Sequence, residues 1–305
     1  MISFINDTQT AAGMNITKED LFFRPDNRPD HSSYFQRFSA SCAHAMSMIA
    51  RRKRLAVAAL IAFLPVLVPL ALAFFSTSQF AESGNNVFVR LAEDLHINVF
   101  TPLLALFFAG MLIAEDIEMR TMIYILTRPM PRSAWVLGRF CAYIFVASLI
   151  LISSAVLTFA ASCVHSNLSL MSAGDIKLLL HYCGVMVLGL FAYGAFSVFL
   201  GAFTRRPIVF GVILFYGWQH LATLIPGLVD FFTIKKYTTA MLPLLATQRH
   251  NPVIETVLGN IQREVFLVGM PKALAALVFI TVVSLLLTIY ATYRREYASD
   301  RAAGG

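Results

Sequence analysis

Long apolar runs without a charged residue alternate with polar segments along the chain. A helix rises about 1.5 Å per residue, so roughly 20 residues are enough to cross the hydrocarbon core of a bilayer. Each run reaches or nearly reaches that length. The pattern therefore predicts an all-α polytopic membrane protein with six transmembrane helices, at residues 55–75, 97–114, 140–164, 178–203, 207–229 and 273–293.

The segment before the first run has a different pattern. Residues 1–32 are polar and lack an apolar period, which predicts a flexible cytoplasmic tail. Residues 33–54 predict an amphipathic helix that begins at a Ser33–Gln36 capping pair and ends in basic residues. Its apolar face comprises Phe35, Phe38, Cys42, Ala45, Met46 and Ile49, while Ser41 falls elsewhere. We expect an interfacial elbow helix on the inner leaflet, or equally a helix packed on the protein's own cytoplasmic loops.

The connections between the runs are also informative. Residues 76–96 are polar and predict an outer loop, whereas 230–272 is too interrupted to span and too apolar to be solvated. The latter segment repeats Val253, Val257, Ile261 and Val265 at four-residue steps, which predicts short re-entrant or interfacial helices between spans five and six. The six-helix domain would cover 55–295, with a cytoplasmic tail at 296–305.

Two features inside the runs predict local structure. Pro65 and Pro69 are expected to kink the first span. Gly194, Ser197 and Gly201 form one stripe of small residues in the fourth span, which is typical of a close helix–helix seam.

Charge sets the expected orientation. Hydrophobic residues make up 58% of the chain and charged residues 13%, and the net charge is +7. The basic residues lie at the ends of the runs and not on one patch, so the membrane explains them and nucleic acid is not an expected partner. With a cytoplasmic N-terminus, 17 of the 24 Lys and Arg residues fall on the inside, which places both termini in the cytoplasm. The first 50 residues show no secretory signal.

The sequence predicts no catalytic or metal site. The four cysteines have no metal-ligand spacing, and neither a Ser/His/Asp arrangement nor an H-E-x-x-H motif is present. His181 and His220 lie inside spans, where an ionisable side chain is a functional candidate by default. A neutral histidine can also be satisfied by one helix–helix hydrogen bond, so both interpretations stay open.

The inner loop at 115–139 is the most informative polar stretch. Glu115, Asp116 and Glu118 lie at the exit of the second span, and a short apolar helical piece follows until Pro129 and Pro131 end it. Apolar groups that face the cytosol indicate a partner protein, or else a loop packed against its own helices.

This loop, in its context, resembles the membrane subunit of an ABC-2 type ATP-binding cassette transporter. The resemblance rests on the acidic exit, the short helix and the R-P-x-x-R element of residues 128–132. The elbow helix, the six spans with both ends inside and the re-entrant segment are similar to the type V (G-subfamily) exporter architecture. The resemblance implies that residues 116–133 couple a separate ATPase to spans one, two and five. The coupling residues it implies are Glu115, Asp116, Glu118, Arg120, Met122, Ile123, Leu126, Arg128 and Arg132.

The resemblance also implies the partners. No G-x-x-x-x-G-K-[ST] phosphate loop is present, so the chain itself is expected to hold no cofactor and to be no enzyme. ATP and Mg²⁺ would be bound by two copies of a partner ATPase, and a second permease chain, an identical copy, would complete the transporter in a bacterial inner membrane.

We therefore expect an exporter of an amphiphilic substrate. Aromatic residues of spans two and five are candidates for its path: Phe100, Phe107, Phe108, Phe210, Phe215, Tyr216, Trp218 and His220. One alternative is a membrane anchor or sensor subunit without transport. A second is an ion-driven secondary transporter, although that class favours internal repeats and polar groups near the midplane.

Overall fold

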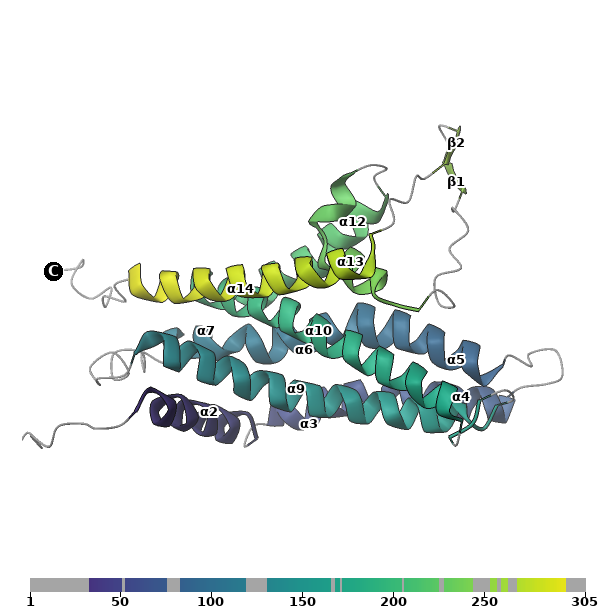
Figure 1. Cartoon of the computed structure of the whole chain (residues 1–305), viewed down its shortest axis with the longest axis horizontal. Helices are drawn as coiled ribbons and strands as arrows, with labels where there is room; N and C mark the ends of the chain where they lie inside the picture. The colour runs from purple at the N-terminus through teal and green to yellow at the C-terminus, as the bar shows by residue number, and fades with distance from the viewer. Residues whose placement is uncertain are drawn as a thin grey trace, which may run out of the picture. The chain divides into compact units, whose positions relative to one another are not determined.

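A computed structural model describes most of the chain from Ser33 onward. The described residues are 33–50, 53–75, 83–118, 131–165, 168–170, 172–204, 206–224, 228–243, 253–256, 259–262 and 268–294. The predictions made for 1–32 and for 296–305 lie outside these residues. The described part is built almost wholly of helices, with one pair of short strands (Figure 1).

The helix before the first span is α2 (Tyr34–Ala50). It lies along the first turns of α9 (Arg132–Ser162), and the Ser41 hydroxyl donates a hydrogen bond to the Trp135 carbonyl at 3.1 Å (Figure 1). Ala45 and Ile49 are buried as predicted, whereas Phe35 is 72% exposed. Ser41 was expected off the buried face but is buried, because this contact satisfies its hydroxyl.

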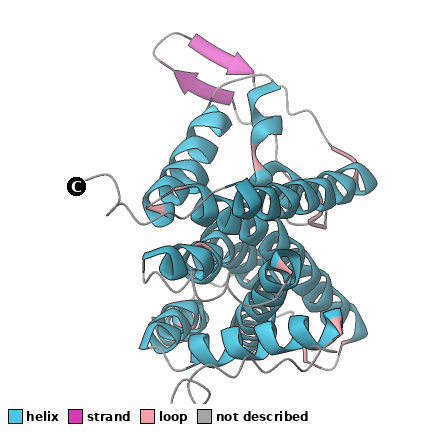
Figure 2. Cartoon of the chain, turned by 90° about the vertical axis from the view of Figure 1, so that its left-hand side faces the viewer, coloured by secondary structure: helices cyan, strands magenta, loops and turns pink. Residues whose placement is uncertain are grey.

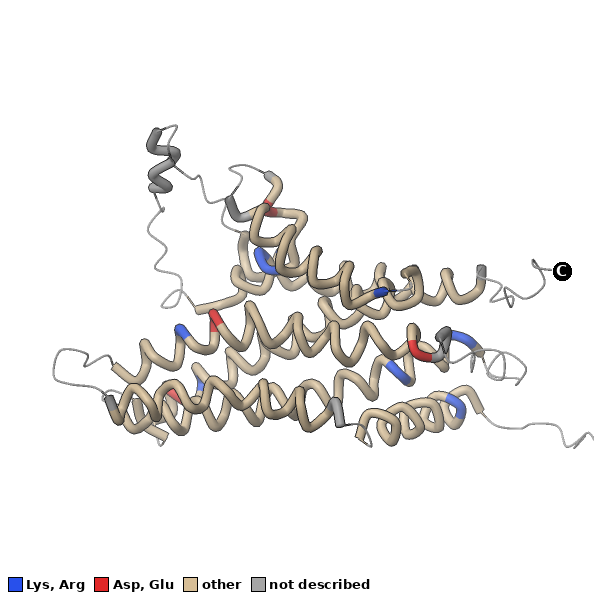
Figure 3. Tube along the Cα trace, turned by 180° about the vertical axis from the view of Figure 1, so that it is seen from behind, with Lys and Arg blue, Asp and Glu red and all other residues tan. Residues whose placement is uncertain are grey.

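Within the part of the chain that the structure describes, five helical segments are long and apolar enough to cross a membrane. They cover Leu55–Phe74, Gly84–Glu115, Arg132–Ser162, Ala173–Phe203 and Met270–Tyr293. The fifth predicted span, 207–229, is a shorter apolar helix at Pro207–Ala222, formed by α11 (Pro207–Val212), the π-helical η3 (Ile213–Trp218) and α12 (Gln219–Leu224). Figure 3 shows that charged residues gather toward the helix ends and leave the middle of the bundle uncharged.

The first span is broken where proline predicts a kink. It comprises α3 (Lys53–Ala62) and α4 (Leu64–Phe75), with Phe63 between them. The Val66 N–H donates to the Phe63 carbonyl at 3.1 Å, so the hydrogen-bond pattern is tightened next to Pro65. Pro69 is accommodated inside α4.

The second span is longer than predicted, and the expected outer loop at 76–96 is wrong over its second half. Helix begins at α5 (Gly84–Leu91) and continues through η1 (Ala92–Phe100), α6 (Thr101–Leu104), η2 (Ala105–Ala109) and α7 (Met111–Glu118), of which η1 and η2 are π-helical. The Ser83 hydroxyl caps α5 by accepting from the Asn86 N–H at 3.4 Å. Phe88 is fully buried against Phe159 and Tyr182, which fixes this extension to the bundle.

The remaining long helices pack around the fourth span. This span is α10 (Ala173–Phe203), which contacts α9, α14 (Met270–Arg294) and the segments of span two. Figure 1 shows α9, α10 and α14 side by side. The predicted small-residue seam is confirmed, because Gly201 faces the backbone of Gly110 and Gly194 faces the ring of Tyr143.

The segment between spans five and six combines helices and strands. The 3-10 helix η4 (Leu228–Phe232) and α13 (Ile234–Ala240) agree with the expected short helices. The helix expected from the four-residue repeat at 253–265 is wrong: β1 (Val253–Thr256) pairs antiparallel with β2 (Gly259–Gln262) (Figure 2). Adjacent β-branched residues at Val253, Ile254 and Thr256 favour a strand, and this local preference outweighs the weak period.

Candidate functional site

One residue of the predicted coupling set, Glu115, lies where α2, α7 and the start of α9 meet. Glu115, near the end of α7, and Arg139, in the third turn of α9, line one hollow of about 40 Å³. Its other walls are apolar and come from α2 and span two, including Ala45, Ile49, Phe107 and Phe108. An acidic and a basic side chain therefore share one small apolar recess at this end of the helices.

Arg139 anchors the recess and was missed by the sequence analysis. Only 4% of its surface is exposed, and one guanidinium nitrogen donates to the Leu112 carbonyl at 2.6 Å. The guanidinium also lies over the Trp135 ring, 4.8 Å from its centroid. Arg139 thus ties span two to span three. The sequence offered one signal for this role: Arg139 directly precedes the apolar run at 140, so it belongs to the same helix.

Arg132 joins the other side of this end of the bundle. As the first residue of α9, it donates to the Thr292 carbonyl at 2.6 Å. Its guanidinium lies 4.8 Å from the centroid of the Tyr293 ring. The first turn of span three is therefore fastened to the last turns of α14, a helix that the sequence analysis did not connect with the inner loop.

The remaining residues of the predicted coupling set have no described side chains. Asp116 and Glu118 belong to the last turn of α7. Five members lie outside the described residues: Arg120, Met122, Ile123, Leu126 and Arg128. Their role as an ATPase contact stays a prediction.

The aromatic residues predicted to line a substrate path do not share one surface. Phe100, Phe107 and Phe108 border hollows on the side of span two that faces α2 and α3. Phe215 is instead buried against the rings of Tyr193 and Phe196 in α10.

The other members of that set lie elsewhere on the short fifth helix. The Tyr216 hydroxyl donates to the Val99 carbonyl at 2.7 Å and so joins this helix to span two. Phe210 and Trp218 are 51% and 39% exposed, and His220 is exposed on the surface of the single chain. The path stays a prediction for these residues.

His96 is a second polar residue that the sequence analysis missed, because 76–96 was expected to be a loop. It is fully buried in the π-helical η1, with Nε2 3.1 Å from the Ser154 hydroxyl and Nδ1 3.2 Å from the Leu91 carbonyl. The Ser154 hydroxyl in turn donates to the Ala62 carbonyl at the break of span one. One polar bridge therefore connects spans one, two and three.

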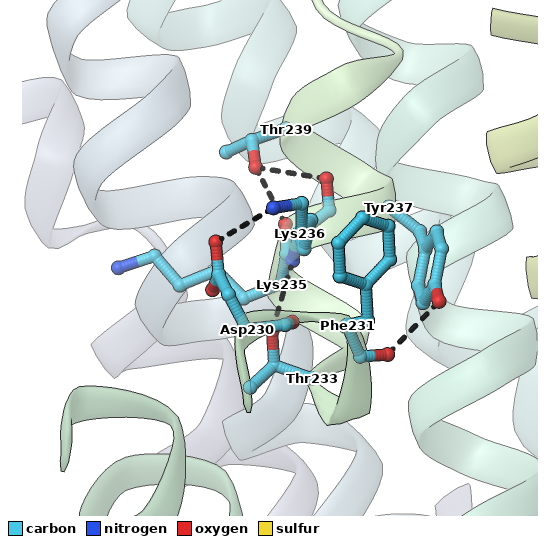
Figure 4. Close-up of polar contacts among 7 residues, drawn as sticks. All are labelled: Asp230, Phe231, Thr233, Lys235, Lys236, Tyr237 and Thr239. Carbon is cyan, nitrogen blue, oxygen red and sulfur yellow. Dashed lines mark hydrogen bonds and ion pairs between the residues drawn. The ribbon is translucent and has the colours of Figure 1, made fainter. Parts of the chain in front are cut away.

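A third polar cluster lies at the turn after the fifth helix (Figure 4). Lys236 Nζ is 3.1 Å from the Asp230 carboxylate and 4.3 Å from the centroid of the Phe231 ring, and both charged side chains are largely buried. The Tyr237 hydroxyl donates to the Phe231 carbonyl at 2.9 Å, while burial, followed by the charge of Asp230, raises the pKa of Tyr237. These contacts hold η4 against α13.

His181 has a structural role in this geometry. Its Nε2 lies 2.7 Å from the Met241 carbonyl, which follows α13. Of the two interpretations left open by the sequence, the single hydrogen bond between elements is the one observed.

Long apolar helices with charged groups at their ends define an integral membrane protein of the polytopic α-helical class. Within that class, a family model described as ABC-2 family transporter protein matches residues 49–219, more than half of the chain. The chain belongs to this family, and the match supports a permease subunit. No curated protein matches the chain.

Proposed function

We propose that the chain is the membrane subunit of an ATP-driven ABC-2 exporter of an amphiphilic substrate. Two copies of a separate ATPase would supply the energy, and a second copy of this chain would complete the substrate path. The observation that carries the proposal is the way both ends of the segment 119–130 are anchored. Glu115 and Arg139 line one recess next to α2, and Arg132 donates a hydrogen bond to the Thr292 carbonyl near the end of α14.

These contacts would let the proposed coupling segment transmit a movement of the ATPase to the spans. A force on residues 116–133 acts directly on α7 and α9, because the segment joins them covalently. The contact of Arg139 with Leu112 passes it between spans two and three, and the contact of Arg132 with Thr292 passes it to span six. The family resemblance led us to expect spans one, two and five, so the contacts add spans three and six to the proposed route.

The first experiment tests the ATPase contact. Ile123→Asp combined with Leu126→Asp should release a copurifying ATPase, because buried apolar contacts supply most of the affinity at such interfaces. Val164→Asp is a suitable control, since Val164 is 65% exposed at the opposite end of α9. If the double variant retains the ATPase at the wild-type ratio, residues 116–133 do not form the contact.

The second experiment tests whether the recess transmits the signal. Glu115→Gln should lower substrate-stimulated ATP hydrolysis while membrane insertion and ATPase binding persist, because it keeps the shape and removes the charge. ATP hydrolysis and ATPase binding should be measured in reconstituted vesicles. Normal stimulation in this variant would remove the Glu115 charge from the mechanism, whereas an assembly that binds ATPase but never transports would favour the anchor or sensor function.

Orientation can be tested separately. In a chain whose four cysteines are replaced by serine, Leu170→Cys should react with an impermeant maleimide from outside, since Leu170 is 56% exposed between spans three and four. Thr127→Cys should react only after permeabilisation. The reverse pattern would invert the proposed topology.

A further inference from the structure

Two of the four cysteines meet where α2 packs on α9. Cys42 lies in the third turn of α2, and Cys141 lies in the third turn of α9. The two thiols are hydrogen-bonded to each other, although spans one and two separate them in the chain. Both are free thiols in this structure. Two oxidisable groups on different helices are therefore in direct contact.

The backbones of these two helices approach closely beside the thiols. Gly138 is one turn before Cys141, and a Cβ atom added there would come within 2.8 Å of the Phe38 carbonyl oxygen and of the Ser41 Cβ. The Ser41 hydroxyl also donates to the Trp135 carbonyl at 3.1 Å. A disulfide needs two Cα atoms about 4.4–6.8 Å apart. The close packing thus lets the thiols bond without a rearrangement of the helices.

Helix α2 is held by a narrow face, so a covalent bond would change how firmly it is attached. Its buried side chains are Ser41, Ala45 and Ile49, and its other side chains are exposed or half-buried. Ala45 and Ile49 also form a wall of the recess that contains Glu115. A bond from α2 to α9 would therefore fix this wall as well as the helix.

The two thiols differ in a way that sets the order of their reactions. Cys141 is exposed, whereas Cys42 is half-buried. Burial, followed by the neighbouring Cys141, raises the pKa of Cys42, so Cys42 keeps its proton at a pH where a free thiol starts to lose it. Cys141 is therefore the first thiol to meet an oxidant, and Cys42 is the partner that closes the disulfide.

We propose that Cys42 and Cys141 form a reversible redox site at which hydrogen peroxide joins α2 to α9 through a disulfide. The Cys141 thiolate attacks a peroxide oxygen; an S–O bond forms, the O–O bond breaks, and the leaving hydroxide takes up the thiol proton as water. The Cys42 thiolate then attacks the sulfenic sulfur; an S–S bond forms, the S–O bond breaks, and a second water leaves. Two thiols and one peroxide give one disulfide and two waters, and two molecules of a thiol reductant such as glutathione restore the thiols.

The first experiment identifies the bond. The purified full chain in micelles is treated with hydrogen peroxide, and peptides are mapped by mass spectrometry. We expect a Cys42–Cys141 disulfide with a mass loss of two hydrogens, which dithiothreitol reverses. Cys42→Ser should instead leave Cys141 as a sulfenic acid that dimedone traps, about tenfold more than in the wild type. If peroxide leaves both thiols free, or oxidises Cys141 without forming the bond, the redox site is refuted.

The second experiment tests whether the bond fixes α2. Hydrogen–deuterium exchange of the α2 amides should slow about tenfold in the oxidised wild type and stay unchanged in peroxide-treated Cys42→Ser. Cys163→Ser is the matched control and should keep both wild-type responses, because Cys163 lies at the opposite end of α9. A disulfide that forms without slower exchange would refute the attachment of α2. Neither experiment uses an ATPase, so their outcome is independent of the proposed transport function.

Discussion

The contact between Gly201 of α10 and Gly110 of span two allows a stringent test of the packing. A Cβ atom added at Gly201 would overlap the carbonyl oxygen of Gly110, a backbone atom that no side-chain rotation can move aside. Gly184 is on the same helix, and a Cβ atom added there meets nothing within 4 Å. Gly201→Ala and Gly184→Ala therefore make the same chemical change in one helix with opposite steric consequences.

The expected effect follows from two terms. Alanine is more favourable than glycine inside a helix by about 1 kcal/mol, and this gain applies to both variants. Overlap at Gly201 forces α10 away from span two, and overpacking of this kind costs about 1–3 kcal/mol. Because the helix term cancels, Gly201→Ala should be less stable than Gly184→Ala by about 1–3 kcal/mol.

Stability can be measured by reversible unfolding in mixed micelles with increasing dodecyl sulfate, followed by circular dichroism. The midpoint for Gly201→Ala should fall below that of Gly184→Ala, and the midpoint for Gly184→Ala should equal or exceed the wild-type value. If the two variants unfold together, the backbones at Gly110 and Gly201 are not in close contact, and the reasoning fails.

Four further predictions concern polar contacts. The thiols of Cys42 and Cys141 are hydrogen-bonded neighbours, so copper phenanthroline should join α2 to α9 by a disulfide, detected as a mass loss of two hydrogens; persistence of both thiols would contradict this packing. Burial, followed by the neighbouring Cys141, raises the pKa of Cys42, so alkylation of Cys42 should accelerate only at a higher pH than for a free thiol, as mass spectrometry can follow. Asp230→Asn should cost about 3–5 kcal/mol in the same unfolding assay by leaving Lys236 buried without its carboxylate, and adding Lys236→Met should restore most of that loss. Ser154→Ala should cost about 1–3 kcal/mol, because it removes the only hydroxyl of the polar bridge, and an unchanged midpoint would show that the bridge adds no stability.

Much of the helix arrangement could be predicted from the sequence. The uncharged runs located the long helices because a bilayer accepts only segments that satisfy their own backbone. The break beside Pro65 and the seam at Gly201 were also predictable, since each depends on a local property of proline or glycine. The inner loop expected at 115–139 is helical at both ends, in α7 up to Glu118 and in α9 from Arg132, and its coupling role stays a proposal.

The errors arose where a polar residue lies on a helix that packs against the bundle. Span two was expected to begin at 97, but it begins at Gly84, because Phe88 is buried although charged residues follow it closely. For the same reason His96 was assigned to a loop, and Arg139 was left outside the third span, which was predicted to begin at 140. A search for uncharged runs ends a helix at its first charge, whereas the backbone hydrogen bonds continue beyond it.

The sequence by itself determined that this chain is a helical membrane protein, because hydrophobic length is a one-dimensional property that the bilayer enforces. Only the tertiary structure decided which polar groups meet: Arg139 with Leu112, Arg132 with Thr292, and His96 with Ser154. These partners are between 27 and 160 positions apart in the chain. Each such contact depends on how two helices are rotated and shifted against each other, and that is fixed by the packing of whole faces and not by any local pattern.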